Sequence, residues 1–413
     1  MNRRATSLNC RGEDQTRVLI LGASIAGPSL AYWLRIYGFN VVVVEKSGFI
    51  RDGGYPIDLR GSAVDVVKKM GLLPMLRKQH VQSDRVSFVD ETGTPVVTIA
   101  PEAITGSVEN RDLEVPRGEL AQMLYALTNG LVEYRFNESI KSLKENRDGV
   151  EVLFSSGRSE LFDLVIGADG IRSKVRELVF GDEPEFYRPL GFYVAGFKVP
   201  NELRLSRQAI IYNTPGRMAA LYAVRENPED LHAFLTFSHP YKLGAEIRDV
   251  EFQRSFIAHS FAGAKWILPK LVQAMRQAED LYFDGVEQIC MTGWSKGRVA
   301  LVGDAAYAPS FLTGQGSSLA LVGAYVLASE LASSTSFEAG FTAYEQKMRP
   351  YVLANQATVE IGKVGIVPTT HEQLEQRNAE MQRQVREGAE DYSRAEHTAI
   401  DLDVYEEIAL PSK

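Results

Sequence analysis

The sequence predicts an α/β protein with a second sheet and a C-terminal helical segment, and three observations lead to this fold class. Residues 18–45 follow the order strand, tight turn, helix, strand, which is the pattern of a βαβ unit. Residues 184–237 form extended segments rich in aromatic side chains, which predict a separate and mainly antiparallel sheet. From residue 369 onward the chain is charged and carries apolar residues at helical spacing.

The βαβ unit begins and ends with short apolar runs. Val18–Leu21 predicts a buried strand, and Pro28–Tyr37 carries its apolar residues on one helical face. Gly38 suits the C-terminus of that helix, and Val41–Val44 predicts the next strand. The order and lengths of these elements match the first unit of a dinucleotide-binding domain.

The turn inside this unit has the glycine spacing of a phosphate-binding loop. Gly22 allows a sharp turn out of the strand, and Gly27 allows the helix to pack closely, so a pyrophosphate can sit on the helix N-terminus. Ser24 stands where the middle glycine of G-x-G-x-x-G is expected, and its hydroxyl can donate to a phosphate. Glu45 ends the second strand, where an acidic side chain accepts hydrogen bonds from an adenosine ribose. The alternative is a glycine-containing turn that binds no nucleotide.

The composition limits the class of protein further. A chain of 413 residues predicts two closely connected domains, and a net charge of -8 without a Lys/Arg-rich block argues against a nucleic-acid partner. Cys10 and Cys290 are the only cysteines, so neither a disulfide framework nor a thiolate metal site is expected, and the predicted location is the reducing cytoplasm. Residues 1–16 predict a disordered leader without a signal sequence. The apolar stretches 18–34 and 317–332 are interpreted as core, with no membrane span.

Periodicity and turn residues predict further elements along the chain. Helices are expected at residues 62–70, around 120–127, and at 249–278, 317–332 and 337–348. Strands are expected at residues 86–90, 96–99, 150–154, 162–166, 281–291 and 298–302, the first two as a hairpin. Pro350 is expected to interrupt the helix that carries Tyr344 and Met348.

Three turns that combine glycine and aspartate follow three predicted strands, at Gly22–Gly27, Asp169–Gly170 and Gly303–Asp304. In this combination the sequence resembles the single-component FAD-dependent aromatic hydroxylases, also called group A flavin monooxygenases. The matching motifs extend from residue 17 to residue 350. The resemblance implies an FAD-binding Rossmann-like domain of the GR2, p-hydroxybenzoate hydroxylase type, interleaved with a substrate-binding sheet and followed by a C-terminal helix.

The resemblance also implies domain boundaries. The FAD-binding domain is expected to be discontinuous and to contain residues 17–75, 100–183 and 281–350. The substrate-binding domain is expected to contain residues 76–99 and 184–280, and residues 351–413 are expected to form the C-terminal helical segment. A monomer or weak dimer is expected.

The resemblance assigns roles to individual residues. In the family, the aspartate at the position of Asp304 binds ribityl hydroxyls, and a segment like Pro309–Gly316 meets the pyrimidine edge of the isoalloxazine. The segment that begins at Asp169 touches the nucleotide and is associated with NAD(P)H, and Arg117 matches an FAD-contacting arginine. The alternatives are a surface arginine at a helix start for Arg117, and an N-cap or turn aspartate for Asp304. The complete set of residues predicted to bind cofactor is Gly22, Ser24, Gly27, Glu45, Arg51, Asp58, Arg117, Asp169, Asp304, Pro309, Gly314, Gln315 and Gly316.

A closer resemblance is to the tetracycline-inactivating branch of this family, the tetracycline destructases. The segment from Arg51 to Asp58 resembles that branch's loop under the flavin, in which the arginine is assigned to NADPH and the aspartate to FAD. Arg217 and His232 resemble positions that bind the polar edge of tetracycline. The alternatives are a solvent-facing arginine in a hairpin and a structural histidine.

The resemblance implies the activity. NAD(P)H reduces FAD, O2 adds at C4a of the flavin, and the resulting hydroperoxide hydroxylates an aromatic or enolic substrate, so no protein side chain is assigned as catalytic. The sequence contains no residue spacing typical of a metal site, so no metal is expected. The sequence does not distinguish NADH from NADPH as the reductant. The substrate is expected to be a small aromatic molecule, with tetracycline-like compounds first and another aromatic polyketide or phenol as the alternative. A flavin halogenase is disfavoured because no second tryptophan accompanies Trp294, and a non-catalytic flavin- or ligand-binding protein remains the alternative from another class.

Overall fold

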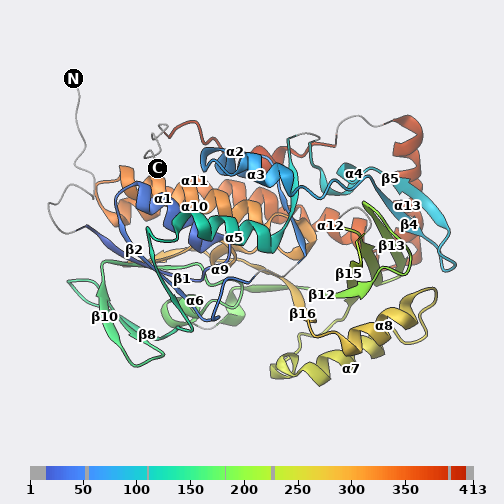
Figure 1. Cartoon of the computed structure of the whole chain (residues 1–413), viewed down its shortest axis with the longest axis horizontal. Helices are drawn as coiled ribbons and strands as arrows, with labels where there is room; N and C mark the ends of the chain where they lie inside the picture. Colours follow the sequence, from blue (N-terminus) through green and yellow to red (C-terminus); the bar gives the residue numbers. More distant parts are fainter. Residues whose placement is uncertain are drawn as a thin grey trace.

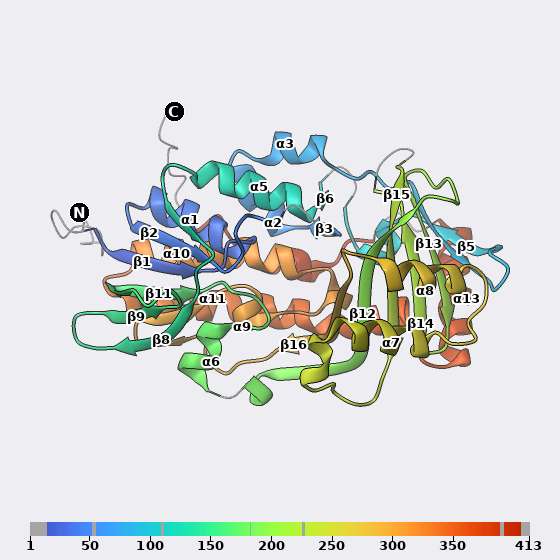
Figure 2. The same cartoon turned by 60° about the horizontal axis from the view of Figure 1, so that its bottom comes forward.

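The computed structural model describes residues 15–51, 55–108, 111–181, 183–224, 228–388 and 392–405. Most of the predicted leader, including Cys10, therefore lies outside the described residues, as do Gly53 and Gly54. The molecule is elongated, with a parallel sheet toward one end of the long axis and a larger sheet toward the other (Figures 1 and 2).

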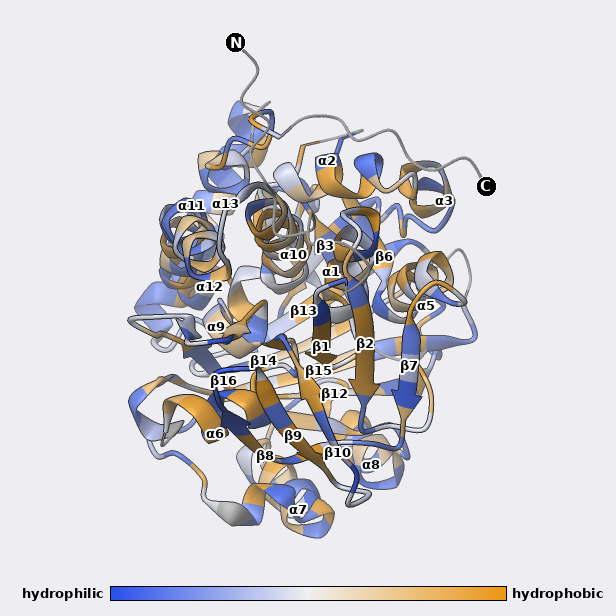
Figure 3. Cartoon of the chain, turned by 90° about the vertical axis from the view of Figure 1, so that its left-hand side faces the viewer, coloured by the Kyte–Doolittle hydropathy of each residue, from blue (hydrophilic) through white to orange (hydrophobic). Residues whose placement is uncertain are grey.

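The first sheet has six strands in the order β17-β18-β11-β1-β2-β7. Their bounds are β1 (Arg17–Leu21), β2 (Asn40–Glu45), β7 (Glu133–Phe136), β11 (Leu164–Gly167), β17 (Ser295–Lys296) and β18 (Val299–Leu301). The central strand β1 runs parallel to β2 and β11, and β11 runs parallel to β18. Strands β1 and β2 are apolar over most of their length and are buried (Figure 3), which is typical of a parallel sheet covered on both faces. Because parallel strands end at one edge, the predicted turns after β1, β11 and β18 lie along the same edge of this sheet.

Helices α1 (Ala26–Ile36), α5 (Arg117–Thr128) and α10 (Gly316–Ser333) pack together over one face of this sheet (Figure 1). A small antiparallel sheet covers the other side and contains β8 (Ile140–Glu145), β9 (Val150–Phe154) and β10 (Ser159–Phe162). The strand predicted at 162–166 is wrong in extent, because the chain crosses from β10 into β11 there. Asp163 stands at the crossing, and its Oδ2 accepts a hydrogen bond of 2.7 Å from the backbone N–H of Arg17.

The predicted second sheet is confirmed, with seven strands in the order β16-β12-β15-β14-β13-β4-β5. Its strands are β4 (Arg85–Val89), β5 (Pro95–Ile99), β12 (Tyr187–Pro200), β13 (Gln208–Thr214), β14 (Arg217–Tyr222), β15 (Asp230–Ser238) and β16 (Tyr282–Ile289). All neighbours are antiparallel except β13 and β4, and the predicted hairpin is β4 and β5. Strand β16 pairs with β12, so residues 282–289 lie in this sheet although we expected them in the FAD-binding domain.

Helices cover both faces of the seven-stranded sheet. Helices α7 (Val250–Ser260) and α8 (Leu268–Gln277) cover one face (Figure 2). Helices α12 (Val359–Ile366) and α13 (His371–Glu387) pack against the other face. The single helix predicted at 249–278 is therefore two helices, separated by a turn in which Trp266 has a positive φ of 55°. The C-terminal helix is confirmed as α13, and Gly388 ends it in the left-handed conformation.

The remaining elements connect the two sheets. They are β3 (Pro56–Leu59), β6 (Leu113–Pro116), α2 (Ser62–Lys69), α3 (Leu73–Lys78), α4 (Glu102–Thr105), α6 (Lys174–Phe180), α9 (Asp304–Tyr307), α11 (Phe337–Ala357) and the short helices η1 (Glu183–Glu185), η2 (Ala245–Arg248), η3 (Phe311–Thr313) and η4 (Ala395–Thr398). The predicted interruption at Pro350 is wrong, because α11 continues through it. Buried residues on both sides of Pro350, including Met348 and Tyr351, hold the helix in place despite the missing N–H donor.

Helix α10 is long and apolar enough to pass a length-and-composition test for a membrane span, and it is the only such helix in the described part of the chain. Its mean hydropathy is 1.2, and 78% of it is buried between α1 and α11. It is therefore a helix of the protein core.

Candidate FAD site and the adjoining recess

The turn after β1 is built by two glycines that no other residue can replace. Gly22 has a φ of +103°, and its N–H donates to the carbonyl of Val44 over 2.8 Å. A Cβ on Gly27 would lie 1.8 Å from the carbonyl oxygen of Gly22, so only glycine lets α1 start this close to the turn. No side chain caps the N-terminus of α1, and its first turn holds no acidic residue. The helix start is therefore open to an anion.

Glu45 holds the same turn from the neighbouring strand. Its side chain is buried, with one oxygen accepting from the N–H of Ala23 and the other from the N–H of Ser47, each at 2.9 Å. Each carboxylate oxygen keeps a second lone pair, which leaves Glu45 able to accept from a ribose hydroxyl as well.

The structure brings four of the predicted residues into one small pocket beside this turn. Nη2 of Arg117, at the first position of α5, donates to Oγ of Ser24 over 2.9 Å. The pocket is lined by Ala23, Ser24, Glu45, Phe49, Ile50, Arg51, Arg117 and Ala121. Two guanidinium groups and a free helix N-terminus in one pocket favour a diphosphate.

Asp304 follows β18 and begins α9, at the same edge of the sheet. The side chain is exposed, although burial by the surrounding protein raises the pKa of its carboxyl and Arg117 opposes the increase. A side chain that is accessible to solvent yet surrounded by protein lines an internal recess. The Asp304 carboxylate has no hydrogen-bond or ion-pair partner among the described residues, so its acceptor capacity is unused.

The predicted loop at residues 309–316 lies close to Asp304. Ser310 and Gly314 have positive φ values of 93° and 66°, which turn the chain sharply on both sides of η3. A Cβ on Gly316 would lie 3.6 Å from Oδ1 of Asp304. Gln315 is fully buried, and neither its side-chain nitrogen nor its oxygen has a partner in the described structure. A buried amide without partners is costly, which indicates that a ligand supplies them.

Asp169 and Arg176 have structural partners that the sequence did not reveal. Oδ2 of Asp169 accepts from the N–H groups of Lys174 and Val175 in the first turn of α6, whose N-cap residue is Ser173. Arg176 is buried, and its Nη1 donates to the carbonyl of Ala305 over 2.8 Å. The segment from Asp169 to Arg176 therefore supports the start of α9 through the Arg176 side chain. The predicted contact of this segment with a nucleotide stays a prediction.

An aromatic cluster forms the wall between the two sheets. The ring of Tyr55 lies 5.5 Å from that of Phe234, 6.0 Å from Phe311 and 6.3 Å from Tyr282. Tyr282 is 45% exposed, while burial raises its pKa well above the usual value, and burial also raises the pKa of Tyr55. Arg117 and Asp304 act electrostatically on both tyrosines, and we call the solvent-accessible region beside Tyr55, Tyr282 and Asp304 the central recess.

The structure does not bring Arg217 and His232 together. Arg217 lies opposite Phe237 in the β14–β15 register, on the face of the sheet that packs against α7 and α8. His232 lies opposite Tyr222, on the same face as Phe234 and thus on the side of the central recess. Burial lowers the pKa of His232, and Lys198 lowers it further, so the imidazole is neutral at pH 7.

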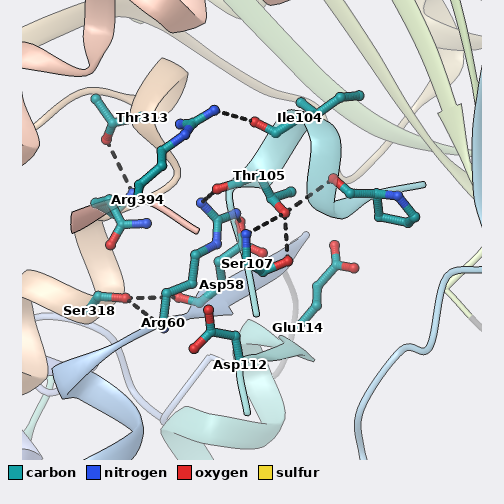
Figure 4. A network of polar contacts seen from close by, with 12 residues as sticks. Asp58, Arg60, Ile104, Thr105, Ser107, Asp112, Glu114, Thr313, Ser318 and Arg394 are labelled. Atoms are coloured by element: carbon teal, nitrogen blue, oxygen red, sulfur yellow. Dashed lines mark hydrogen bonds and ion pairs between the residues drawn. The ribbon is translucent and has the colours of Figure 1, made fainter. Parts of the chain in front are cut away.

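Asp58 belongs to a polar network beside the loop of Gly314 (Figure 4). Its carboxylate forms an ion pair with the buried Arg60, and Nη1 of Arg60 donates to the carbonyl of Thr105 over 2.7 Å. Oγ of Ser318 on α10 donates to the backbone carbonyl of Asp58. Sequence reasoning missed Arg60 and the nearby Glu114, although Glu114 stands only three residues before Arg117.

These features fit an FAD cofactor. The glycine turn and the open N-terminus of α1 suit the diphosphate, the unpaired Asp304 carboxylate suits hydroxyl donors, and the orphaned amide of Gln315 suits a polar ring edge. Among the described residues no group of three or more His, Cys, Asp and Glu side chains could hold a metal ion. The fold and the site together define a flavoprotein of the class that joins an FAD domain to a substrate sheet.

Comparisons with known proteins agree with this class. Residues 15–358 match the family described as "FAD binding domain". An uncharacterized protein of Mycobacterium tuberculosis is 41% identical over 360 residues, covering 87% of this chain and 96% of the relative. A "Flavin-dependent monooxygenase" from an unknown prokaryotic organism is 38% identical over 365 residues, covering 88% and 94%. The crystal structure of tetracycline destructase Tet(55) superposes with a TM-score of 0.81 at 36% identity, covering 95% of this chain and 99% of that one.

The chain therefore belongs to the FAD binding domain family. It is a flavin-dependent monooxygenase with the fold of the p-hydroxybenzoate hydroxylase type. The predicted family, fold class and FAD cofactor are confirmed.

Proposed function

We propose that this monooxygenase uses NAD(P)H and O2 to hydroxylate an aromatic or enolic substrate of the tetracycline type. The observation that carries the proposal is the aromatic wall of Tyr55, Phe234 and Phe311, which adjoins the recess that contains Asp304. Such a wall favours a flat, multi-ring molecule through stacking and apolar burial. The similarity in fold to tetracycline destructase Tet(55) supports the substrate class. A cytoplasmic location and the expected domain boundaries, apart from residues 282–289, remain part of this proposal.

The residues of the chain have separate tasks in this function. FAD, when bound, supplies the electron transfer from NAD(P)H and the activation of O2. Arg117, Asp304 and the start of α1 hold the cofactor, and the aromatic wall positions the substrate and excludes water. His232 is neutral and can donate or accept a hydrogen bond at the polar edge of the substrate.

The test of the proposed function is NADPH consumption by the FAD-loaded protein with and without tetracycline, followed by mass analysis of the drug. Stimulated consumption and a product that has gained one oxygen atom are expected. Stimulation without an oxygenated product would show an uncoupled oxidase. No stimulation by tetracycline or by a panel of simpler phenols would contradict the proposal.

Arg51 is expected to contact NADPH because it is exposed and lines the pocket that contains Arg117. Arg51→Ala should raise KM for NADPH roughly ten-fold, the typical effect of losing one charged phosphate contact, while FAD content stays unchanged. The effect with NADH should be smaller, since NADH lacks the 2′-phosphate. Lys46→Ala is the matched control, because Lys46 is exposed nearby but does not line the pocket. Equal KM values in Arg51→Ala and wild type would remove Arg51 from the site.

His232 and Arg217 offer a paired test of substrate contact. His232→Ala should raise the substrate KM roughly ten-fold, because a buried polar contact on the recess side is lost. Arg217→Ala should change KM less, since this arginine lies on the opposite face of the sheet. Steady-state kinetics with tetracycline at constant FAD occupancy make the comparison. A larger effect of Arg217→Ala would place the substrate on the face of α7 and α8 instead.

A further inference from the structure

A carboxyl group that no predicted role uses lies on the substrate side of the seven-stranded sheet. Glu114 belongs to β6, and its Oε2 accepts a hydrogen bond from the hydroxyl of Tyr222 at the end of β14. Oγ of Ser83 shares a hydrogen bond of 2.8 Å with the same tyrosine hydroxyl. The contact therefore joins the two-stranded sheet of β3 and β6 to the seven-stranded sheet and fixes one oxygen of Glu114.

The other oxygen of Glu114 is free. Oε1 has no hydrogen-bond partner among the described residues, and Glu114 keeps part of its surface accessible. Burial nevertheless raises the pKa of its carboxyl, as it does for Asp304 in the central recess. Since Oε1 has no partner and is not one of the fully buried polar atoms, it faces a space that solvent can reach.

That space adjoins the aromatic wall. Tyr222 lies opposite His232 across β14 and β15, and the next residues on the same face are Ala220 and Phe234. Phe234 is the residue that contacts Tyr55 in the wall. Glu114 thus contacts Tyr222, which is one cross-strand pair away from Phe234, the ring that we assign to substrate positioning.

The charges around Glu114 leave it able to gain and lose a proton. The neighbouring carboxylates Asp58 and Glu102 raise its pKa, Arg60 lowers it, and the Tyr222 hydrogen bond also lowers it. Arg60 already pairs with Asp58, so no cation is committed to Glu114. On the remaining side, Nδ1 of His80 lies within hydrogen-bond distance of the backbone N–H and C=O of Glu114 and bonds to one or the other according to its tautomer, which leaves the carboxyl free. Figure 4 shows Glu114 beside Asp58 and Arg60.

We propose that Glu114 accepts the proton of a substrate hydroxyl, and that Tyr222 positions it. The proposal rests on the proposed function, since it assigns a phenolic or enolic hydroxyl to the substrate. The O–H bond of the substrate breaks, its electron pair stays on the oxygen, and the proton binds Oε1 of Glu114. The electron-rich phenolate or enolate so formed is the better acceptor of an oxygen atom. A proton acceptor whose pKa lies near the working pH is the most efficient one.

The first test follows the ionisation of a bound phenol in the FAD-loaded protein without turnover. 4-Nitrophenol is the probe, because its phenolate is yellow and its phenol is not. In Glu114→Gln the amide oxygen still accepts from Tyr222, but the proton acceptor is gone. In wild type the yellow colour of the bound probe should titrate as one of two coupled groups that share a proton, whereas in Glu114→Gln it should follow a single ionisation. A single ionisation in both proteins, or no binding of the probe to wild type, would overturn the proposal.

Turnover gives the second test. Glu114→Gln should lower kcat for product formation by roughly 10²- to 10⁴-fold, the usual contribution of a general base, while flavin reduction by NADPH without substrate is unchanged. In wild type kcat/KM should rise with pH along the titration of one group, and this dependence should vanish in the variant. Glu151→Gln, an exposed residue of β9, is the matched control. A wild type that forms no oxygenated product would refute the proposed function, whereas the probe titration would still decide the role of Glu114.

Thermal stability gives a third readout, which reports the pKa of Glu114 in the folded protein. Burial and then Asp58 raise the pKa of Glu114 from 4.5 to about 8. Between these values the folded protein holds a proton that the unfolded chain has lost, so this stabilisation is present below pH 4.5 and is lost as pH rises toward 8. The Tm of wild type should therefore fall relative to that of Glu114→Gln across this range. Parallel curves would contradict the proposal.

Tyr222→Phe, which keeps Glu114, should shift the pH profile of kcat/KM without abolishing activity.

Discussion

Asp304→Ala is expected to yield largely FAD-free protein. The carboxylate has no partner among the described residues, and the protein that surrounds it raises its pKa. Because no described residue bonds to this carboxylate, all of its lone pairs can accept hydrogen bonds from ligand hydroxyls. Each hydrogen bond to a charged group contributes about 1.5–3 kcal/mol, so FAD affinity should fall roughly ten- to hundred-fold for each one lost.

The measurement is the ratio of flavin to protein absorbance after desalting, with the Kd for added FAD from fluorescence quenching. Asp148→Ala is the control, because Asp148 is an exposed aspartate in the turn between β8 and β9. Asp304→Ala should also remain folded, since the carboxylate supports no contact within the described chain. Full FAD occupancy in Asp304→Ala would contradict the assignment of this residue.

Gly27→Ala is expected to destabilise the fold itself. The new Cβ would lie 1.8 Å from the carbonyl oxygen of Gly22, and that oxygen is backbone that cannot rotate away. Overpacking typically costs about 1–3 kcal/mol and sometimes more, and the cost here should reach or exceed the upper end. We expect most of the variant to be insoluble and any soluble part to bind FAD poorly, since α1 must move away from the turn.

Soluble yield and thermal unfolding of the apoprotein measure this effect. Gly293→Ala is the matched control, because a Cβ on Gly293 meets no atom within 4 Å and its φ lies outside the left-handed range. Its unfolding free energy should stay close to that of wild type. A Gly27→Ala protein as stable as Gly293→Ala would show that α1 does not depend on the close approach.

The structure brings together several of the residues predicted to bind cofactor, but not the two predicted to bind substrate. Ser24, Glu45, Arg51 and Arg117 share one pocket because they follow strands or begin helices at one edge of a parallel sheet, and such positions can be recognised from local patterns. By contrast, the predicted pair Arg217 and His232 is separated by a whole sheet. Side chains alternate between faces along a strand, so the register between β14 and β15 had to be known before their faces could be assigned.

The helix and strand boundaries that were predicted wrongly also depend on the packing of the folded chain. The strand predicted at 162–166 is interrupted at Asp163, whose carboxylate accepts a hydrogen bond from Arg17, far away in the sequence. The helix at Pro350 continued because buried neighbours such as Met348 and Tyr351 compensate for one lost hydrogen bond. Local propensity carries no information about either contact.

The sequence by itself determined the family, the parallel sheet with its glycine turns, and the acidic and basic residues that suit an FAD site. These features are local, because a turn that needs Gly22 or a strand that needs Val41–Val44 is encoded by adjacent residues. Only the tertiary structure decided that Glu114 meets Tyr222, a residue 108 positions away in the chain. Burial of that pair creates the shifted pKa and the free oxygen, and burial is a property of the packed molecule alone.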